Sequence, residues 1–149
     1  MTNIIKVNQL TKIFGNTKAL DHCDLEVKKG EIFGYLGPSG AGKTTTIKLL
    51  TGQLHSDGGE ITVLGKNPFS PEIRHQIGIM SDMSGLYEKM TVYENLDIFA
   101  DIYGITDKKR KIEKALASVE LLDAGKKKVE KLSRGMKQRL VVARTIIHS

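Results

Sequence analysis

Residues 37–45 read GPSGAGKTT and combine glycine, hydroxyl and lysine residues at a spacing that suits phosphate binding. The pattern G-x-x-x-x-G-K-S/T is satisfied by Gly37, Gly42, Lys43 and Thr44. Glycines adopt positive φ angles and let backbone N–H groups approach an anion without a Cβ atom in the way. At a helix N-terminus such N–H groups converge on phosphate oxygens, and the helix dipole adds positive potential. The pattern therefore predicts a loop that holds a nucleoside triphosphate.

The positions of this loop have separate expected roles. Lys43 is predicted to neutralise charge between the β- and γ-phosphates, and the Thr44 hydroxyl to ligate Mg²⁺. Pro38 has no N–H, so it shapes the turn without donating. The competing interpretation is a glycine-rich strand-to-helix turn that binds nothing. The predicted nucleotide-binding residues here are Gly37, Pro38, Ser39, Gly40, Ala41, Gly42, Lys43, Thr44 and Thr45.

A strand and a helix must position this loop. The apolar run 32–36 is short and bounded by glycines, which predicts a buried strand. Residues 44–54 have an apolar face at helical spacing, which predicts a helix. Further strands are predicted at 4–7, 24–27, 61–64 and 77–80, with a turn at 56–59.

The second half of the chain is predicted to be helical. Thr91 and Glu94 form a capping-box pair ahead of an apolar stripe with helical spacing. A second helix is predicted over 107–122, and a third from Ser133. The pattern thus predicts a strand-rich first half followed by a helical second half.

The composition is that of a globular protein. The 149 residues are 40% hydrophobic and 27% charged, which excludes a disordered chain and predicts one domain. We expect no signal peptide at the N-terminus and no bilayer span, because no stretch approaches the length of apolar sequence that a span needs. Cys23 is the only cysteine, which excludes an internal disulfide and fits a reducing cytoplasm. It is interpreted as a small core residue.

The net charge of +6 raises the question of nucleic-acid binding. Much of the excess lies in the runs 108–111 and 126–128, while aromatic residues make up only 5% of the chain. Stacking platforms for bases are therefore missing, which argues against a nucleic-acid partner. The first run is interpreted as a solvated helix face, with an anionic partner such as a membrane surface or nucleic acid as the alternative.

A second motif places the chain among known proteins. LSRGMKQR at 132–139 resembles the LSGGQ-type signature of ATP-binding-cassette (ABC) proteins. The segments 19–52, 58–65 and 91–96 are also similar to the family in their residue patterns and in their order along the chain. The resemblance implies the fold class α/β, with a P-loop NTPase core, an N-terminal antiparallel β portion and an α-helical signature subdomain. Residues of about 1–85 are assigned to the β-rich core and about 86–149 to the helical subdomain.

The resemblance also implies site residues outside the loop. Phe14 occupies the position of an aromatic residue that stacks on adenine; the alternative is a core aromatic residue beside Ile13. The signature would contact ATP held by an opposing subunit in a head-to-tail dimer, although Ser133 has the alternative role of a simple helix cap. The signature residues are Ser133, Arg134, Gly135 and Met136.

Two positions depart from the family pattern. Arg134 replaces a usual glycine and either approaches the γ-phosphate or points to solvent. Asp82 stands where the family has a glutamine that contacts Mg²⁺, so it is a candidate metal ligand; the alternative is a turn aspartate.

The family's remaining catalytic groups are expected beyond Ser149. These are the Walker B Asp, the catalytic Glu and the switch His, so the C-terminal part of the core is missing and His148 is not the switch residue. Residues 1–149 alone are expected to lack ATP turnover. A fragment, a natural truncation and a core strand supplied by another chain all remain open.

The function implied by the resemblance is that of an ABC transporter's ATP-binding subunit. Such a subunit binds Mg²⁺ and ATP, pairs with a second ATP-binding subunit and couples hydrolysis to a transmembrane permease at the cytoplasmic face of the cell membrane. The segment SDMSGLY at 81–87 is similar to the corresponding segment of ABC exporters of drugs or antibiotics. The alternatives are a non-catalytic nucleotide-binding or dimerisation module, and a soluble ABC protein that acts in DNA repair or translation.

Overall fold

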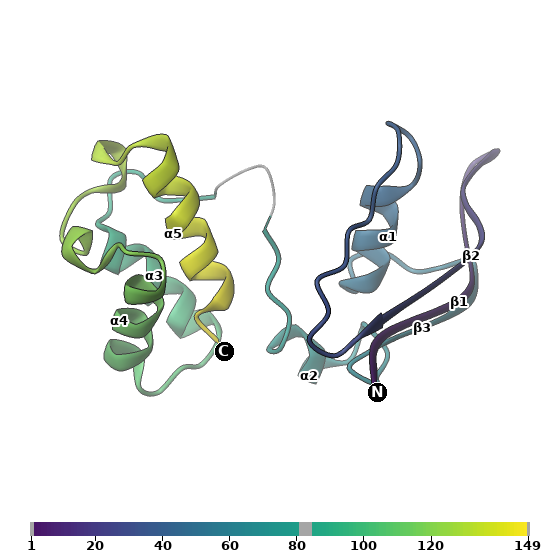
Figure 1. The fold of residues 1–149 in the computed structure, drawn as a ribbon, viewed down its shortest axis with the longest axis horizontal. Coiled ribbons are helices and arrows are strands. Elements are labelled where there is room, and N and C mark those ends of the chain that lie inside the picture. Colours follow the sequence, from purple (N-terminus) through teal and green to yellow (C-terminus); the bar gives the residue numbers. More distant parts are fainter. Residues whose placement is uncertain (1, 81–84, 149) are drawn as a thin grey trace. The chain divides into compact units, whose positions relative to one another are not determined.

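The computed structural model describes residues 2–80 and 85–148 (Figure 1). The chain divides into two compact units, residues 1–77 and residues 78–149. Each unit has its own cluster of buried hydrophobic side chains. The first unit contains the sheet and the predicted phosphate loop, and the second contains the predicted signature.

A three-stranded antiparallel sheet forms the frame of the first unit. Its strands are β1 (Asn3–Phe14), β2 (Thr17–Lys28) and β3 (Gly58–Val63), in the order β2-β1-β3. The strands predicted at 4–7 and 24–27 are confirmed as parts of β1 and β2, and the one at 61–64 overlaps β3.

Helix α1 (Lys43–Leu50) packs against this sheet and ends four residues earlier than predicted. Leu49 is fully buried and clusters with Val7, Leu10 and Leu20 of β1 and β2. Because burial of apolar surface is the main stabilising term of a small fold, this contact fixes α1 on the sheet. A short helix, α2 (Pro71–Arg74), follows β3.

The strands predicted at 32–36 and 77–80 are not strands in the structure. Ile32 is 101% exposed and Leu36 is 91% exposed, so the first segment is also not buried. A strand exists only where a neighbouring backbone completes its hydrogen bonds. Within 2–80 and 85–148 no strand pairs with either segment, so their apolar composition alone does not produce extended ladders.

The second unit is helical, as predicted. It contains α3 (Val92–Ile102), α4 (Lys108–Ser118) and α5 (Arg134–Ile146), with short 3₁₀ turns at Leu122–Ala124 and Val129–Lys131. The apolar stripes of the three helices meet in one core. Its fully buried large side chains include Leu96, Ile112, Leu116, Leu140 and Ile147.

The start of α3 is fixed by polar groups. Thr91 and Glu94 form the predicted capping box, with each side chain bonded to the other residue's backbone N–H. Asn95 is fully buried, and its amide bonds to the Tyr87 N–H, to the Tyr87 carbonyl and to the Thr91 carbonyl at 2.8–3.0 Å. These bonds tie the segment before α3 to the helix, because a buried amide is stable only when hydrogen-bonded.

The basic run at 108–111 forms the first turn of α4 and is partly neutralised. The Lys108 ammonium lies 2.6 Å from Asp101 and 3.3 Å from Asp97, and Arg110 pairs with Asp107. The run therefore lies at the surface of the helical unit with acidic partners of its own. Across the part of the chain that the structure describes, the helices are too short or too polar to cross a bilayer.

Candidate nucleotide-binding site

The predicted phosphate loop lies at the N-terminal end of α1 (Figure 1). Gly42 is the N-cap residue and has a left-handed backbone with φ 78°. Among the described residues no side chain caps this helix end, and its first turn has no acidic residue. The first-turn N–H groups, which cannot bond within the helix, are therefore left for an external acceptor. This is the arrangement that binds anions at helix N-termini.

The Lys43 ammonium lies across the loop. It donates to the carbonyl oxygens of Gly37 and Pro38, both at 2.6 Å. An ammonium has three N–H donors, so these bonds hold its position while one donor remains for an anion. The lysine thus brings a positive charge to the same loop whose first-turn N–H groups have no side-chain cap.

Close packing on β2 explains why position 42 needs glycine. A Cβ atom at Gly42 would lie 2.6 Å from the Ala19 carbonyl oxygen and 2.6 Å from Leu20 Cδ2. The loop is therefore anchored directly on the backbone of β2. A larger residue here would both strain the left-handed backbone and push the loop off the sheet.

Thr46 and Tyr35 support the loop from behind, and the motif did not indicate them. Thr46 is buried, and its hydroxyl donates to the Gly42 carbonyl at 3.0 Å and lies 3.3 Å from the Tyr35 hydroxyl. Thr44 is exposed and Thr45 is half-buried, and these two predicted nucleotide-binding residues directly precede Thr46. The hydroxyl of Thr46 had no distinguishing signal beyond its position next to the motif.

Phe14 lies at the surface at the end of β1. The residue is 48% exposed and Ile13 is 40% exposed, so the interpretation of Phe14 as a core residue is wrong. Phe14 pairs with Thr17 across the β1–β2 hairpin, only two positions from Ala19, which touches Gly42. The hairpin that carries the aromatic ring and the phosphate loop are thus joined through β2.

The predicted signature begins α5 in the second unit. The Ser133 hydroxyl accepts the Met136 N–H at 3.2 Å, which confirms the predicted N-cap. A hydroxyl that accepts one bond still has its own proton to donate. Arg134 and Gly135 are exposed, and a Cβ atom at Gly135 would meet open space. The cap is therefore accessible, with its hydroxyl and first-turn N–H groups at one helix end.

The loop suits a magnesium-bound polyphosphate. First-turn N–H groups without a side-chain cap and an ammonium held at the loop match several phosphate oxygens, and the exposed Thr44 offers one oxygen ligand. Mg²⁺ commonly takes its other ligands from substrate phosphates and water. In the described ranges no three His, Cys, Asp or Glu side chains cluster as a separate metal site. Asp82, the other predicted metal ligand, lies outside the described residues.

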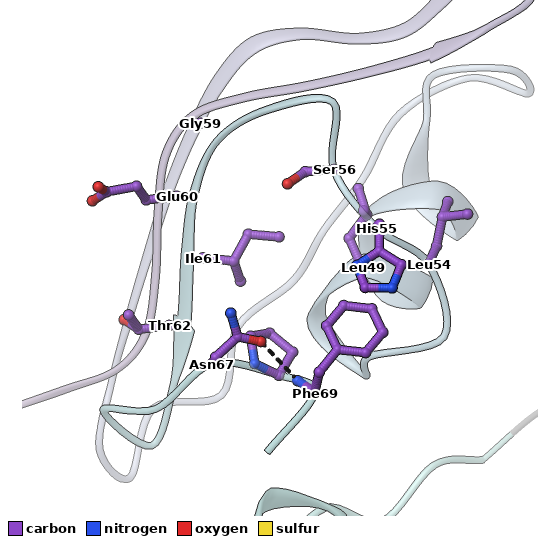
Figure 2. A pocket seen from close by; sticks show the side chains of 11 residues that line it. Leu49, Leu54, His55, Ser56, Gly59, Glu60, Ile61, Thr62, Asn67 and Phe69 are labelled. Atoms are coloured by element: carbon purple, nitrogen blue, oxygen red, sulfur yellow. Dashed lines mark hydrogen bonds between the residues drawn. The ribbon is translucent and has the colours of Figure 1, made fainter.

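A separate cavity of about 350 Å³ lies near the other end of α1 (Figure 2). Its walls include Leu49, Leu54 and Ile61, and the rings of His55 and Phe69 stack there with centroids 3.8 Å apart. None of its lining residues belongs to 37–45, so it is distinct from the predicted phosphate site.

Comparisons with known proteins agree with the family resemblance seen in the sequence. The family model described as ABC transporter matches residues 20–149. The chain is 45% identical over 150 residues to the bacitracin transport ATP-binding protein BcrA of Bacillus licheniformis, covering 99% of this chain and 49% of that protein. It is 42% identical over 154 residues to a fluoroquinolones export ATP-binding protein of Mycobacterium tuberculosis, covering 99% and 50%.

A solved structure shows the same fold. The ATP-binding subunit of an ABC transporter superposes with a TM-score of 0.82 at 27% identity, covering 97% of this chain and 62% of that one. The predicted fold class, a partial P-loop NTPase core with an antiparallel β portion and a helical subdomain, is therefore confirmed. The chain spans about half the length of the curated relatives it matches.

Proposed function

The chain belongs to the ABC transporter family, and from this premise we propose that the complete protein is the ATP-binding subunit of such a transporter. The observation that carries the proposal is the loop at 37–45, where first-turn N–H groups of α1 without a side-chain cap occur together with a Lys43 ammonium bonded to the loop carbonyls. Polyphosphate recognition uses this combination of backbone N–H donors and one positive charge.

Each part of the loop has a defined task in this proposal. The N–H groups and Lys43 hold the phosphates, and Thr44 supplies a hydroxyl for Mg²⁺. Phe14 offers an exposed ring face to the adenine. Bound Mg·ATP supplies the phosphoanhydride bond whose hydrolysis releases free energy. The residues of this chain bind and orient it, and we assign hydrolysis to the complete protein.

The signature gives the proposal its oligomeric form. Ser133 to Met136 form an accessible helix end that suits contact with a nucleotide held by another subunit. We propose a head-to-tail pair of ATP-binding subunits that acts with a transmembrane permease at the cytoplasmic face of the membrane. One of the two relatives is named for bacitracin transport and the other for fluoroquinolones export. These names favour a drug or an antibiotic as the exported substrate.

Replacement of Lys43 tests the phosphate site. In the complete protein we expect Lys43→Ala to raise the Kd for Mg·ATP at least about tenfold, since a charge-assisted contact to phosphate is lost. Isothermal titration calorimetry measures the change. The matched control is Lys48→Ala, which removes an exposed lysine from the last turn of the same helix. Equal Mg·ATP affinity for the Lys43 and Lys48 variants would contradict the proposal.

A further inference from the structure

We propose that Asp57 is a positioning residue for nucleotide recognition, which fixes Phe14 so that one face of its ring remains open to the base. This inference rests on the proposed function, because it deepens the assignment of Phe14 as the base contact. Asp57 lies in the turn before β3, and no sequence pattern connects it with the end of β1.

One carboxylate holds two groups beside Phe14. Asp57 Oδ2 accepts the Ile13 backbone N–H at 2.7 Å, one residue before the ring. Each of the two carboxylate oxygens lies 3.1 Å from the Lys12 ammonium, 45 positions away in sequence. The Asp57 N–H in turn donates to the Thr11 carbonyl at 3.0 Å. Residues 11–13 are therefore bound from one side by a single aspartate.

The sheet explains why β1 needs this support. Pairing of β1 with β3 ends at Thr11 opposite Gly58, and the β1–β2 register shifts between Lys12 and Ile13. Beyond Thr11, the β3 side of the ladder offers no further backbone partner. Pairing with β2 continues through Ile13 and Phe14, while on the β3 side the Asp57 carboxylate accepts the Ile13 N–H in place of the next carbonyl.

Lys12, which pairs with Asp57, also contacts the Phe14 ring. Its side chain is only 11% exposed, and its ammonium lies over the Phe14 ring at 5.4 Å from the centroid. A cation above an aromatic face is attracted by the ring quadrupole. The ammonium occupies one face, so a stacked base has the opposite face available. The buried stem of Lys12 limits ring motion in a way that an exposed lysine would not.

The ionised form of Asp57 is the one that can hold both partners. The Ile13 N–H and then the Lys12 ammonium lower the pKa of Asp57 below its ordinary value of 3.8. The carboxylate therefore stays ionised at neutral pH, and the contacts with Ile13 and Lys12 persist there.

The test separates base binding from phosphate binding in the complete protein. Calorimetry with Mg·ATP and with magnesium tripolyphosphate, which has no base, gives two affinities for each variant. We expect Phe14→Ala to weaken Mg·ATP binding about 5- to 100-fold through loss of stacking, with tripolyphosphate binding unchanged. Asp57→Asn is expected to weaken Mg·ATP binding about three- to tenfold, again without effect on tripolyphosphate.

A double variant distinguishes positioning from general damage. If Asp57 acts through Phe14, Asp57→Asn has no further effect on Mg·ATP affinity in a Phe14→Ala background. The matched control is Asp21→Asn, since Asp21 also pairs with a lysine, Lys18 at 3.1 Å, on the same sheet. Asp21→Asn is expected to leave both affinities unchanged.

The remaining outcomes overturn the inference in recognisable ways. Unchanged Mg·ATP affinity in Asp57→Asn, equal losses for both ligands, or a further loss in the Phe14→Ala background would each exclude a positioning role. An inert Phe14→Ala variant would remove the base contact and the inference together. The phosphate-site proposal would then still stand or fall on the Lys43→Ala result.

Discussion

Gly40 and Gly42 have similar backbones but different surroundings. Both have positive φ angles, 82° and 78°, yet a Cβ atom at Gly40 would meet nothing within 4 Å. A Cβ atom at Gly42 would meet the Ala19 carbonyl oxygen and the Leu20 side chain at 2.6 Å. The pair therefore separates backbone strain, which both share, from steric overlap, which only Gly42 has.

This difference predicts unequal effects on stability. Gly40→Ala is expected to cost about 1 kcal/mol because alanine is strained at positive φ, and Gly42→Ala to cost at least about 1 kcal/mol more. Chemical denaturation of the ligand-free protein measures both. The loop's packing on β2 would be refuted by equal stabilities, because ligand contacts play no part in that measurement.

At the scale of the element, the capping box at the start of α3 contains a titratable group, the Glu94 carboxylate. The Thr91 N–H donates to Glu94 at 2.7 Å and the Thr91 hydroxyl at 2.8 Å. These bonds lower the pKa of Glu94 below its ordinary value of 4.5. A carboxyl group with a depressed folded-state pKa stabilises the fold above its unfolded-state pKa. That stabilisation is lost as the pH falls through the depressed value.

Thr91→Ala and Glu94→Gln test this helix start. Thr91→Ala is expected to lower the stability of α3 by about 1 kcal/mol, the usual cost of losing an N-cap. Glu94→Gln is expected to flatten the loss of stability on acidification from neutral pH to below 4.5. Amide hydrogen-exchange protection factors in the first turn of α3 report both changes. Glu113→Gln, an exposed position on α4, is the control and should keep the wild-type profile.

At the scale of the whole molecule, the separate cores predict separate responses to cavities. Leu96 and Leu10 are both fully buried, the first in the helical unit and the second in the sheet unit. Replacing either with alanine is expected to cost about 2–5 kcal/mol in its own unit. Hydrogen exchange should speed up around the replaced residue's core and not in the other one. Equal acceleration in both units after Leu96→Ala would mean that the two cores unfold together.

Local patterns predicted a large part of this fold because they depend on neighbours in sequence. The capping box at Thr91, the cap at Ser133 and the three helices of the second unit are confirmed, since helix hydrogen bonds join residues four positions apart. The segment 32–36 was predicted wrongly for the opposite reason. Its apolar residues favour a strand, but a strand depends on a partner elsewhere in the chain.

The sequence by itself determined the glycine-rich turn into α1 and predicted phosphate binding there, because the glycines, lysine and hydroxyls are contiguous and their chemistry needs only a following helix. Only the tertiary structure decided that Asp57 binds the Lys12 ammonium and the Ile13 N–H beside Phe14. That meeting depends on the register in which β3 pairs with β1. Register is set by long-range packing and turn geometry, so residues 45 positions apart gave no local signal of their contact.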